Sequence, residues 1–196
     1  MVWSYSGVRP LVEDAAASAA AATRDFRLDH DTDGAPLLSV FGGKITTFRK
    51  LAEEAVDWIA PVLGNHTTTW TAHACLPGGD LFGARPSKRG VLEFDDWLAR
   101  LQQRHPWLPA PLALRYARAY GTRVSVLLEG CTSLADLGAQ IVPQLYEAEA
   151  RYLMRHEWAR SAADMLWRRS KLGLHVPADS AARLDAWISA AALPQS

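Results

Sequence analysis

The first part of the chain alternates polar and apolar positions in the way that short strands do. Residues 2–8 alternate large and small side chains and predict a short strand that ends at Gly7. Residues 24–41 predict a hairpin, because a segment with a period of two is followed by an Asp-Gly turn in residues 31–34 and by the apolar run 37–41. Such a continuous run is typical of a buried strand.

Gly42 and Gly43 interrupt this run, and a helical pattern follows them. Over about residues 45–62 the apolar side chains recur on one face, which predicts a helix. Strand, hairpin, glycine turn and helix together indicate that residues 1–63 are the end of an α/β domain. The alanine-rich segment 15–22 has high helix propensity but no large apolar side chain to bury, so it fits a helix or a loose surface segment.

The pattern changes after residues 64–90, a Gly- and Pro-rich stretch that is a linker by composition. Residues 91–196 show helical periodicity and no strand-like alternation. The expected helices span about residues 91–104, 110–120, 123–129, 143–158, 161–171 and 179–193. We therefore expect a mainly α protein, in which an N-terminal α/β remnant precedes an all-α C-terminal domain of five or six helices.

Charge and composition exclude several classes of protein. The 196 residues hold 21 Lys and Arg against 21 Asp and Glu, so the chain lacks the basic surface of a dedicated nucleic-acid binder. No run of about 18 apolar residues is present, so the sequence predicts no membrane span. Cys75 and Cys131 lie far apart without metal-ligand spacing, so we expect two buried thiols and no metal site.

The segment from Gly42 to Thr47 is the most informative local feature. Ligands of open α/β sheets bind at the carboxyl ends of strands, and helix N-termini present unpaired N–H groups to anions. Lys44 adds a positive charge, although the spacing is not that of a P-loop and an ordinary capped turn has the same pattern. Arg9, held in a turn by Pro10, is either a bidentate donor to a carboxylate or phosphate or an ordinary surface arginine.

A basic stretch lies near the end of the chain. Residues 151–171 contain six Lys and Arg against two acidic residues. Either a solvated helical face or ion pairs between domains explains this excess of positive charge. The alternative is that these residues bind an acidic membrane surface. His156 and Glu157 lie on an expected helix but lack the second His of a zinc-binding motif.

Several motifs in order give the chain a resemblance to a known family. The two long ones are residues 3–11 and 37–53, with Thr23-Arg24-Asp25 between them. Shorter ones follow at residues 76–79, 116–121, 146–149, 156–158 and 167–173. Together they resemble the last part of FAD-dependent glycerol-3-phosphate dehydrogenases, and most of all the aerobic, quinone-linked bacterial type.

The resemblance implies an oxidoreductase that oxidises sn-glycerol 3-phosphate to dihydroxyacetone phosphate and passes electrons through FAD to ubiquinone. It implies a cytoplasmic location, with peripheral attachment to the inner face of the cytoplasmic membrane. Residues 1–63 then correspond to the end of the FAD- and substrate-binding domain, and residues 91–196 to the helical domain. The GxGxxG fingerprint of FAD domains is absent, so we expect the chain to be a fragment that is inactive by itself.

The resemblance also implies roles for individual residues. Arg9 matches an arginine that faces the substrate, and Arg24 matches a second basic residue on the substrate side. The turn at the flavin is matched by Gly42, Gly43, Lys44, Ile45 and Thr46. In such a turn, main-chain N–H groups approach the flavin ring and stabilise negative charge on it, and Lys44 and Arg9 fit catalytic roles.

Two other functions fit the same residues. The first alternative is a non-catalytic helical module of the same enzyme, used for docking or oligomerisation. The second is the related oxidase, which uses oxygen as electron acceptor. The apolar run 37–41 has only one helix to cover it, so we also expect either disorder there or a homodimer formed through this region.

Overall fold

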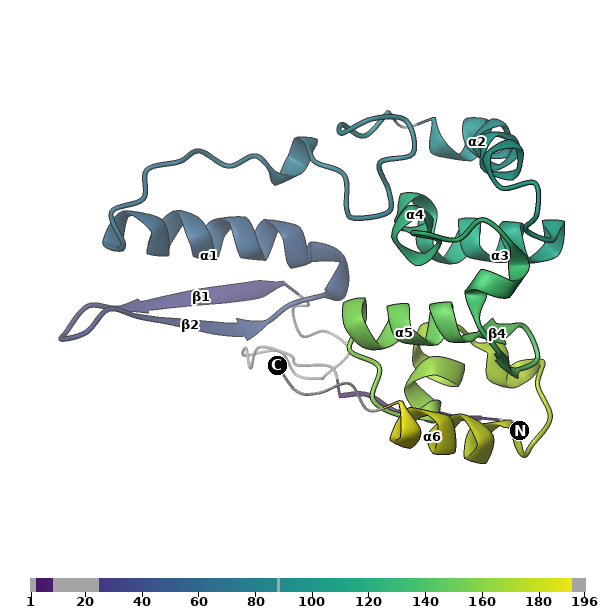
Figure 1. Cartoon of the computed structure of the whole chain (residues 1–196). Coiled ribbons are helices and arrows are strands. Elements are labelled where there is room, and N and C mark those ends of the chain that lie inside the picture. Colours follow the sequence, from purple (N-terminus) through teal and green to yellow (C-terminus); the bar gives the residue numbers. More distant parts are fainter. Residues whose placement is uncertain (1–2, 9–24, 88, 192–196) are drawn as a thin grey trace. The chain divides into compact units, whose positions relative to one another are not determined.

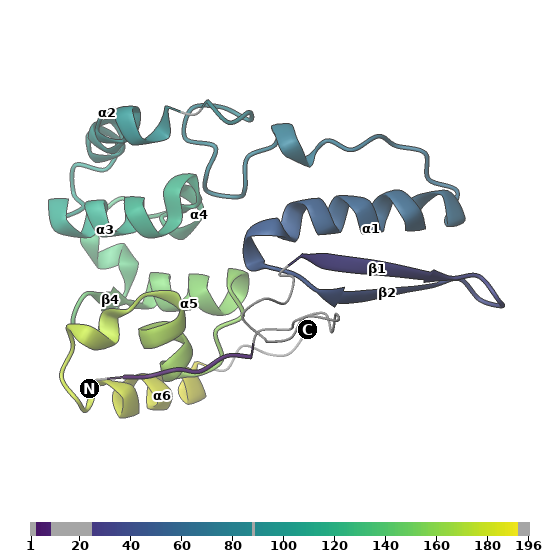
Figure 2. The ribbon, with the colours of Figure 1, turned by 180° about the vertical axis from the view of Figure 1, so that it is seen from behind.

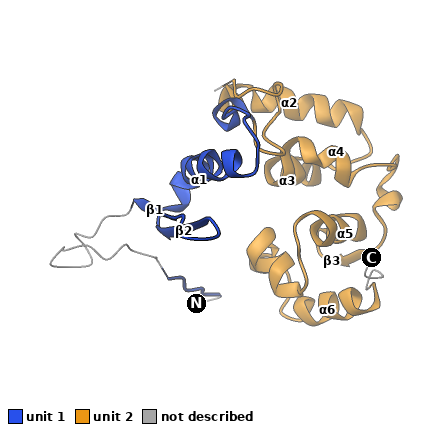
Figure 3. Cartoon of the chain, turned by 90° about the vertical axis from the view of Figure 1, so that its left-hand side faces the viewer, with its two compact units in different colours: residues 1–74 blue, residues 75–196 orange. Residues whose placement is uncertain are grey.

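The computed structural model describes residues 3–8, 25–87 and 89–191, and it divides the chain into two compact units (Figure 3). The first unit is Met1–Ala74 and the second is Cys75–Ser196. The alanine-rich segment 15–22 lies outside the described residues. Within the described ranges, no helix is both long enough and apolar enough to cross a membrane.

The first unit contains an antiparallel hairpin, which confirms the prediction made for residues 24–41. Strand β1, Phe26–Asp31, pairs with strand β2, Leu37–Gly42. Within the turn, the N–H of Gly34 donates to the carbonyl oxygen of Thr32 at 2.9 Å. The Asp-Gly pair therefore marks the turn correctly.

One helix lies along this hairpin in both Figure 1 and Figure 2. A 3-10 turn at Ile45–Thr47 leads directly into α1, Phe48–Val62, as the apolar pattern over residues 45–62 predicts. His30 of β1 stacks on Trp58 of α1, with ring centroids 4.7 Å apart. The helix is thus held on one face of the hairpin, and a further 3-10 turn, Thr71–His73, ends the unit.

Two expectations for the first unit are wrong. The run 37–41 is not a buried strand, because Leu37, Val40 and Phe41 are 56%, 48% and 43% exposed. Among the described residues of this unit, a two-stranded sheet packed against one α-helix leaves one face of β2 without cover. The strand expected over residues 2–8 is also missing: residues 3–8 have no regular secondary structure, since no strand of the described chain pairs with them.

The second unit is mainly helical, as expected, and surrounds one hydrophobic core. Its α-helices are α2, Gly90–Arg104; α3, Ala110–Tyr120; α4, Val124–Leu127; α5, Glu147–His156; and α6, Ser180–Ala190. A π-helical segment spans Asp164–Arg169, and 3-10 turns span Gly121–Arg123, Leu134–Leu137 and Leu172–Leu174. Tyr116, Leu101, Leu153 and Met165 are among its fully buried side chains.

A small hairpin corrects the expectation that this domain is all-α. Strand β3, Gln140–Val142, pairs antiparallel with β4, Leu145–Tyr146, and Gln144 in the turn has a φ of +66°. Both strands contribute buried side chains. The helix expected over residues 143–158 therefore begins only at Glu147. Strands this short contain too few positions to show alternation in the sequence.

One carboxylate is completely buried in the core of the second unit. Glu149 on α5 accepts hydrogen bonds from Nη1 and Nη2 of Arg115 on α3, at 2.6 and 2.5 Å. The hydroxyl of Tyr120 donates to the same carboxylate at 2.6 Å, and Arg115 also donates to the carbonyl oxygen of Gln144 at 2.6 Å. Burial, with Glu149 beside it, raises the pKa of Tyr120 far above its usual value, so the phenol stays a donor.

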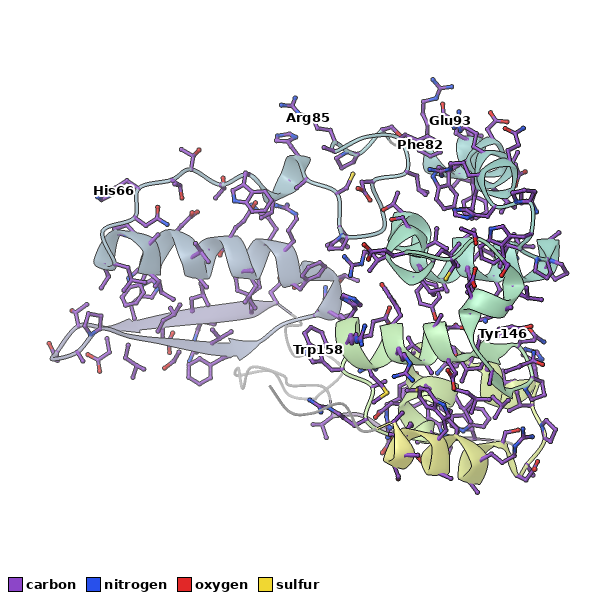
Figure 4. The ribbon with its side chains drawn as sticks, in the orientation of Figure 1. His66, Phe82, Arg85, Glu93, Tyr146 and Trp158 are labelled. Carbon is purple, nitrogen blue, oxygen red and sulfur yellow. The ribbon has the colours of Figure 1, made fainter. Side chains whose placement is uncertain are left out.

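The glycine-rich segment before α2 packs against the helices of the second unit. Phe82, labelled in Figure 4, lies against the core. The carbonyl oxygen of Gly78 accepts the N–H of Thr122 at 3.1 Å. A Cβ on Gly78 would lie 2.6 Å from the carbonyl oxygen of Tyr120, and a Cβ on Gly121 would overlap the main chain of Gly78. Two main-chain segments therefore meet here at a distance that only glycine permits.

We expect residues 75–196 to fold without the first unit, because they hold their own core and their own buried ion pair. A chain that starts at Cys75 should unfold in one cooperative thermal transition, followed by far-ultraviolet circular dichroism. A soluble sample that melts without a cooperative transition would contradict this.

We expect Gly121→Ala to destabilise the second unit by about 3 kcal/mol or more, because it adds a main-chain overlap to an unfavourable backbone conformation. Gly130→Ala is the matched control. Gly130 also has a positive φ, +74°, but a Cβ there meets nothing within 4 Å, so about 1 kcal/mol is expected. Urea unfolding followed by tryptophan fluorescence measures both, and equal losses would show that the contact with Gly78 contributes nothing.

Candidate functional site

Strand β2 ends in a turn with a backbone that glycine adopts readily. Gly42 and Gly43 have φ values of +69° and +105°. Lys44 then returns to an extended conformation, with φ −107° and ψ 149°, and Ile45 begins the helical turn. The positive φ values explain why two glycines stand at this point in the sequence.

Hydrogen bonds of Thr47 fix the main chain where this turn enters the helix. The carbonyl oxygen of Lys44 accepts the N–H of Thr47 at 3.0 Å and its hydroxyl at 2.9 Å, which fixes the start of the helix. Among the described residues, the N–H groups of Ile45 and Thr46 have no acceptor. The first N–H groups of a helix lack partners within it and carry the positive end of its dipole, so they favour an electron-rich group.

Lys44 adds a full positive charge to these donors. Its side chain is exposed, and no acidic side chain in the described parts of the chain forms an ion pair with it. Ile45 beside it is 88% exposed. The turn is therefore an open, electropositive surface built from consecutive residues.

The predicted site residues are only partly placed by the structure. Gly42, Gly43, Lys44, Ile45 and Thr46 share the one turn described above. Arg9 and Arg24, the substrate residues that the resemblance implies, lie outside the described residues. Their part in a substrate site stays a prediction.

The turn fits part of a flavin. A flavin ring carries carbonyl oxygens and gains negative charge on reduction, which suits main-chain donors and the ammonium group of Lys44. The sequence contains no GxGxxG fingerprint for the pyrophosphate of FAD. The donors of the turn suit the ring of a flavin, and that this turn binds the cofactor stays a prediction.

A polar cluster at α1 is not revealed by the residue pattern of the sequence. Arg49 pairs with Glu53 at 2.7 Å, and the hydroxyl of Thr71 donates to Glu53 Oε1 at 2.5 Å. Chiefly because of the bond from Thr71, the pKa of Glu53 lies below its usual value. A cavity of about 200 Å³ lies alongside. Glu53 and Thr71 are 18 residues apart, so no local pattern reveals that they meet.

The two cysteines are less buried than expected. Cys75 and Cys131 are free thiols of intermediate exposure, and burial raises the pKa of Cys131. Throughout the ranges that the structure describes, no group of three or more His, Cys, Asp or Glu side chains is placed to hold a metal ion.

Comparison with known proteins identifies the family of the helical part. Residues 69–192 match the family described as the C-terminal domain of alpha-glycerophosphate oxidase. The chain belongs to this family. The match covers the second unit as far as residue 192, and the turn at Gly42 lies before it.

Whole-chain similarity to curated relatives confirms the resemblance to glycerol-3-phosphate dehydrogenases. The chain is 47% identical, over 96% of its length, to the aerobic glycerol-3-phosphate dehydrogenase of Escherichia coli. It is 46% identical over 94% of its length to the glycerol-3-phosphate dehydrogenase of Pseudomonas aeruginosa, and 40% identical over 97% to the D-erythritol 1-phosphate dehydrogenase of Brucella abortus. It spans about a third of the length of these relatives: 36%, 35% and 36%.

We expect the chain alone to bind FAD more weakly than about 1 µM, because its sequence holds no GxGxxG fingerprint for the pyrophosphate of the cofactor. Titration of FAD, followed by quenching of flavin fluorescence, measures the affinity, and light scattering reports the oligomeric state. A monomer that binds FAD at or below that concentration would mean that these residues also hold the phosphates of the cofactor.

Proposed function

We propose that this chain is part of a flavoprotein that oxidises sn-glycerol 3-phosphate to dihydroxyacetone phosphate. The observation that carries the proposal is the 47% identity to the Escherichia coli enzyme over 96% of the chain. The open turn from Gly42 to Thr46 supports it, because this turn has the donors and the charge that a flavin ring requires.

The turn contributes electrostatic stabilisation in this proposal. Bound FAD would supply the acceptor for the hydride that leaves the carbon whose hydroxyl group becomes a ketone. Lys44 and the N–H groups of Ile45 and Thr46 lower the free energy of negative charge developing beside them, because they are fixed before the reaction begins. The tight start of the helix at Thr47 holds these donors in place.

Substrate binding is assigned to arginine in the same proposal. A guanidinium group presents parallel donors that match two oxygens of a phosphate group. Arg9 and Arg24 are the residues that the resemblance implies for this role. Neither belongs to the turn at Gly42, so substrate binding and cofactor stabilisation use separate residues.

A longer polyol phosphate is the second candidate substrate. The observation that favours it is the 40% identity to the D-erythritol 1-phosphate dehydrogenase of Brucella abortus over 97% of the chain. Both candidate substrates are polyol phosphates, and the oxidation of a secondary alcohol is the shared chemistry.

Several further expectations stay predictions within this proposal. They are ubiquinone as electron acceptor in preference to oxygen, peripheral attachment to the inner face of the cytoplasmic membrane, and association of two chains. The exposed apolar face of β2 and the exposed Phe48 and Val56 of α1 support association with further protein surface.

A chimera tests the proposed function directly. The segment of the Escherichia coli enzyme that matches this chain is replaced by the chain, and turnover of glycerol 3-phosphate is measured with an artificial electron acceptor. We expect an active, FAD-containing enzyme. Lys44→Met should lower kcat by about 10²-fold, because a preorganised charge at the reacting group is lost.

Lys50→Met is the matched control, because Lys50 is exposed on α1 outside the turn. It should change kcat by less than about twofold, as an exposed charge contributes little. A soluble chimera that holds FAD but oxidises neither glycerol 3-phosphate nor D-erythritol 1-phosphate would refute the proposed function. Preference for D-erythritol 1-phosphate would select the second candidate.

A further inference from the structure

One threonine forms hydrogen bonds with the main chain on both sides of Lys44. The hydroxyl of Thr47 donates to the carbonyl oxygen of Lys44 at 2.9 Å, and the N–H of Lys44 donates to the same hydroxyl at 3.4 Å. The N–H of Thr47 also donates to that carbonyl oxygen, at 3.0 Å. The two peptide groups that flank Lys44 are therefore both bonded to a single residue three positions later.

The residues before Lys44 cannot take over this task. Gly42 and Gly43 have no side chains with which to bond to Lys44, and glycine has the widest backbone freedom of all residues. Their positive φ values allow the chain to turn, but they do not hold the residue that follows. The position of the Lys44 main chain is therefore set mainly from its C-terminal side, where Thr47 lies.

Thr47 is itself well placed to hold its neighbours. It is half-buried and directly precedes α1, and its branched Cβ restricts the side chain to few rotamers. The helix is held in turn by the stacking of His30 on Trp58 and by the hydrogen bond from Thr71 to Glu53. The hydroxyl of Thr47 thus links the turn to a helix whose place is already fixed.

The adjacent threonine does not have the same contacts. Thr46 is exposed, and among the residues that the structure describes no partner bonds its hydroxyl. A side chain that bonds back from the third position of a helical turn also stabilises helix N-termini in general. The hydroxyl of Thr47 can therefore stabilise the start of α1, position Lys44, or do both, and these roles predict different results.

We propose that Thr47 is a positioning residue for Lys44, and that its hydroxyl fixes the main chain from which the ammonium group acts on the cofactor. The inference rests on the proposed function, in which Lys44 stabilises negative charge on the flavin. Fixed groups stabilise developing charge better than mobile ones, because they do not have to be ordered during the reaction. Loss of the hydroxyl should therefore impair the action of Lys44 although the lysine is still present.

The first test uses the chain without cofactor. Relaxation of ¹⁵N nuclei gives the order parameter of the Lys44 amide, and we expect about 0.85, the value of a rigid backbone. Thr47→Val should lower this order parameter to about 0.6 or less, and Thr47→Ser, which keeps the hydroxyl, should restore it. Thr68→Val removes an exposed hydroxyl after α1 and should change nothing. An order parameter that Thr47→Val leaves unchanged would show that the hydroxyl does not hold Lys44.

The second test uses the chimera with the Escherichia coli enzyme. Thr47→Val should lower kcat for glycerol 3-phosphate about tenfold and change KM less than about twofold, as expected when stabilisation of the transition state is lost. The ratio of reduced to oxidised flavin at a fixed potential should also fall about tenfold, which is a shift of the midpoint potential by about 30 mV to more negative values. Thr47→Ser should keep kcat within about threefold of the unaltered chimera.

A double variant separates positioning from helix stability. If the hydroxyl acts through Lys44, adding Thr47→Val to Lys44→Met should lower kcat by a further threefold or less, about, in place of tenfold. A further tenfold loss without the lysine would refute the proposal, as would an unchanged midpoint potential in Thr47→Val. A chimera that holds FAD but oxidises neither polyol phosphate would refute the proposed function, while the order parameter and the midpoint potential would still decide the role of Thr47.

Discussion

The second unit depends on one buried ion pair. Glu149 on α5 has no contact with solvent, and Arg115 on α3 donates a hydrogen bond to each of its two carboxylate oxygens. Leaving either charge alone in the core would cost about 3–5 kcal/mol, so the two helices have a strong preference for one relative position. Because Tyr120 and the carbonyl oxygen of Gln144 join the same network, the end of α3 and the β3–β4 turn are fixed with it.

The first unit is organised by a different constraint. Its hairpin has one helix on one face, held by the stacking of His30 on Trp58, and an apolar strand open on the other. This arrangement places the glycine turn, because β2 ends at Gly42, where the turn begins, and α1 begins at Phe48, just after it. The electropositive turn thus joins a hairpin and a helix, and the hairpin leaves apolar side chains of β2 exposed to solvent.

Local signals in the sequence predicted those features that depend on neighbouring residues. The Asp-Gly pair gave the hairpin turn, and apolar spacing gave α1 and the main helices of the second unit. The glycines at 42 and 43 correctly marked the turn. The β3–β4 hairpin was not predicted, because its strands are too short to show an alternating pattern. The run 37–41 was predicted to be buried, because its apolar composition does not reveal that the described residues of the first unit provide no second covering layer. Pairings such as Glu149 with Arg115, 34 positions apart, leave no local signal.

The contact between Gly78 and Gly121 has a consequence for how such sequences vary. Each position is blocked by main-chain atoms of the other segment rather than by a side chain. A larger residue at one position therefore has no compensating substitution at the other, because every residue has the same main chain. Any sequence that keeps this crossing is expected to keep both glycines, and the two positions will show invariance rather than covariation.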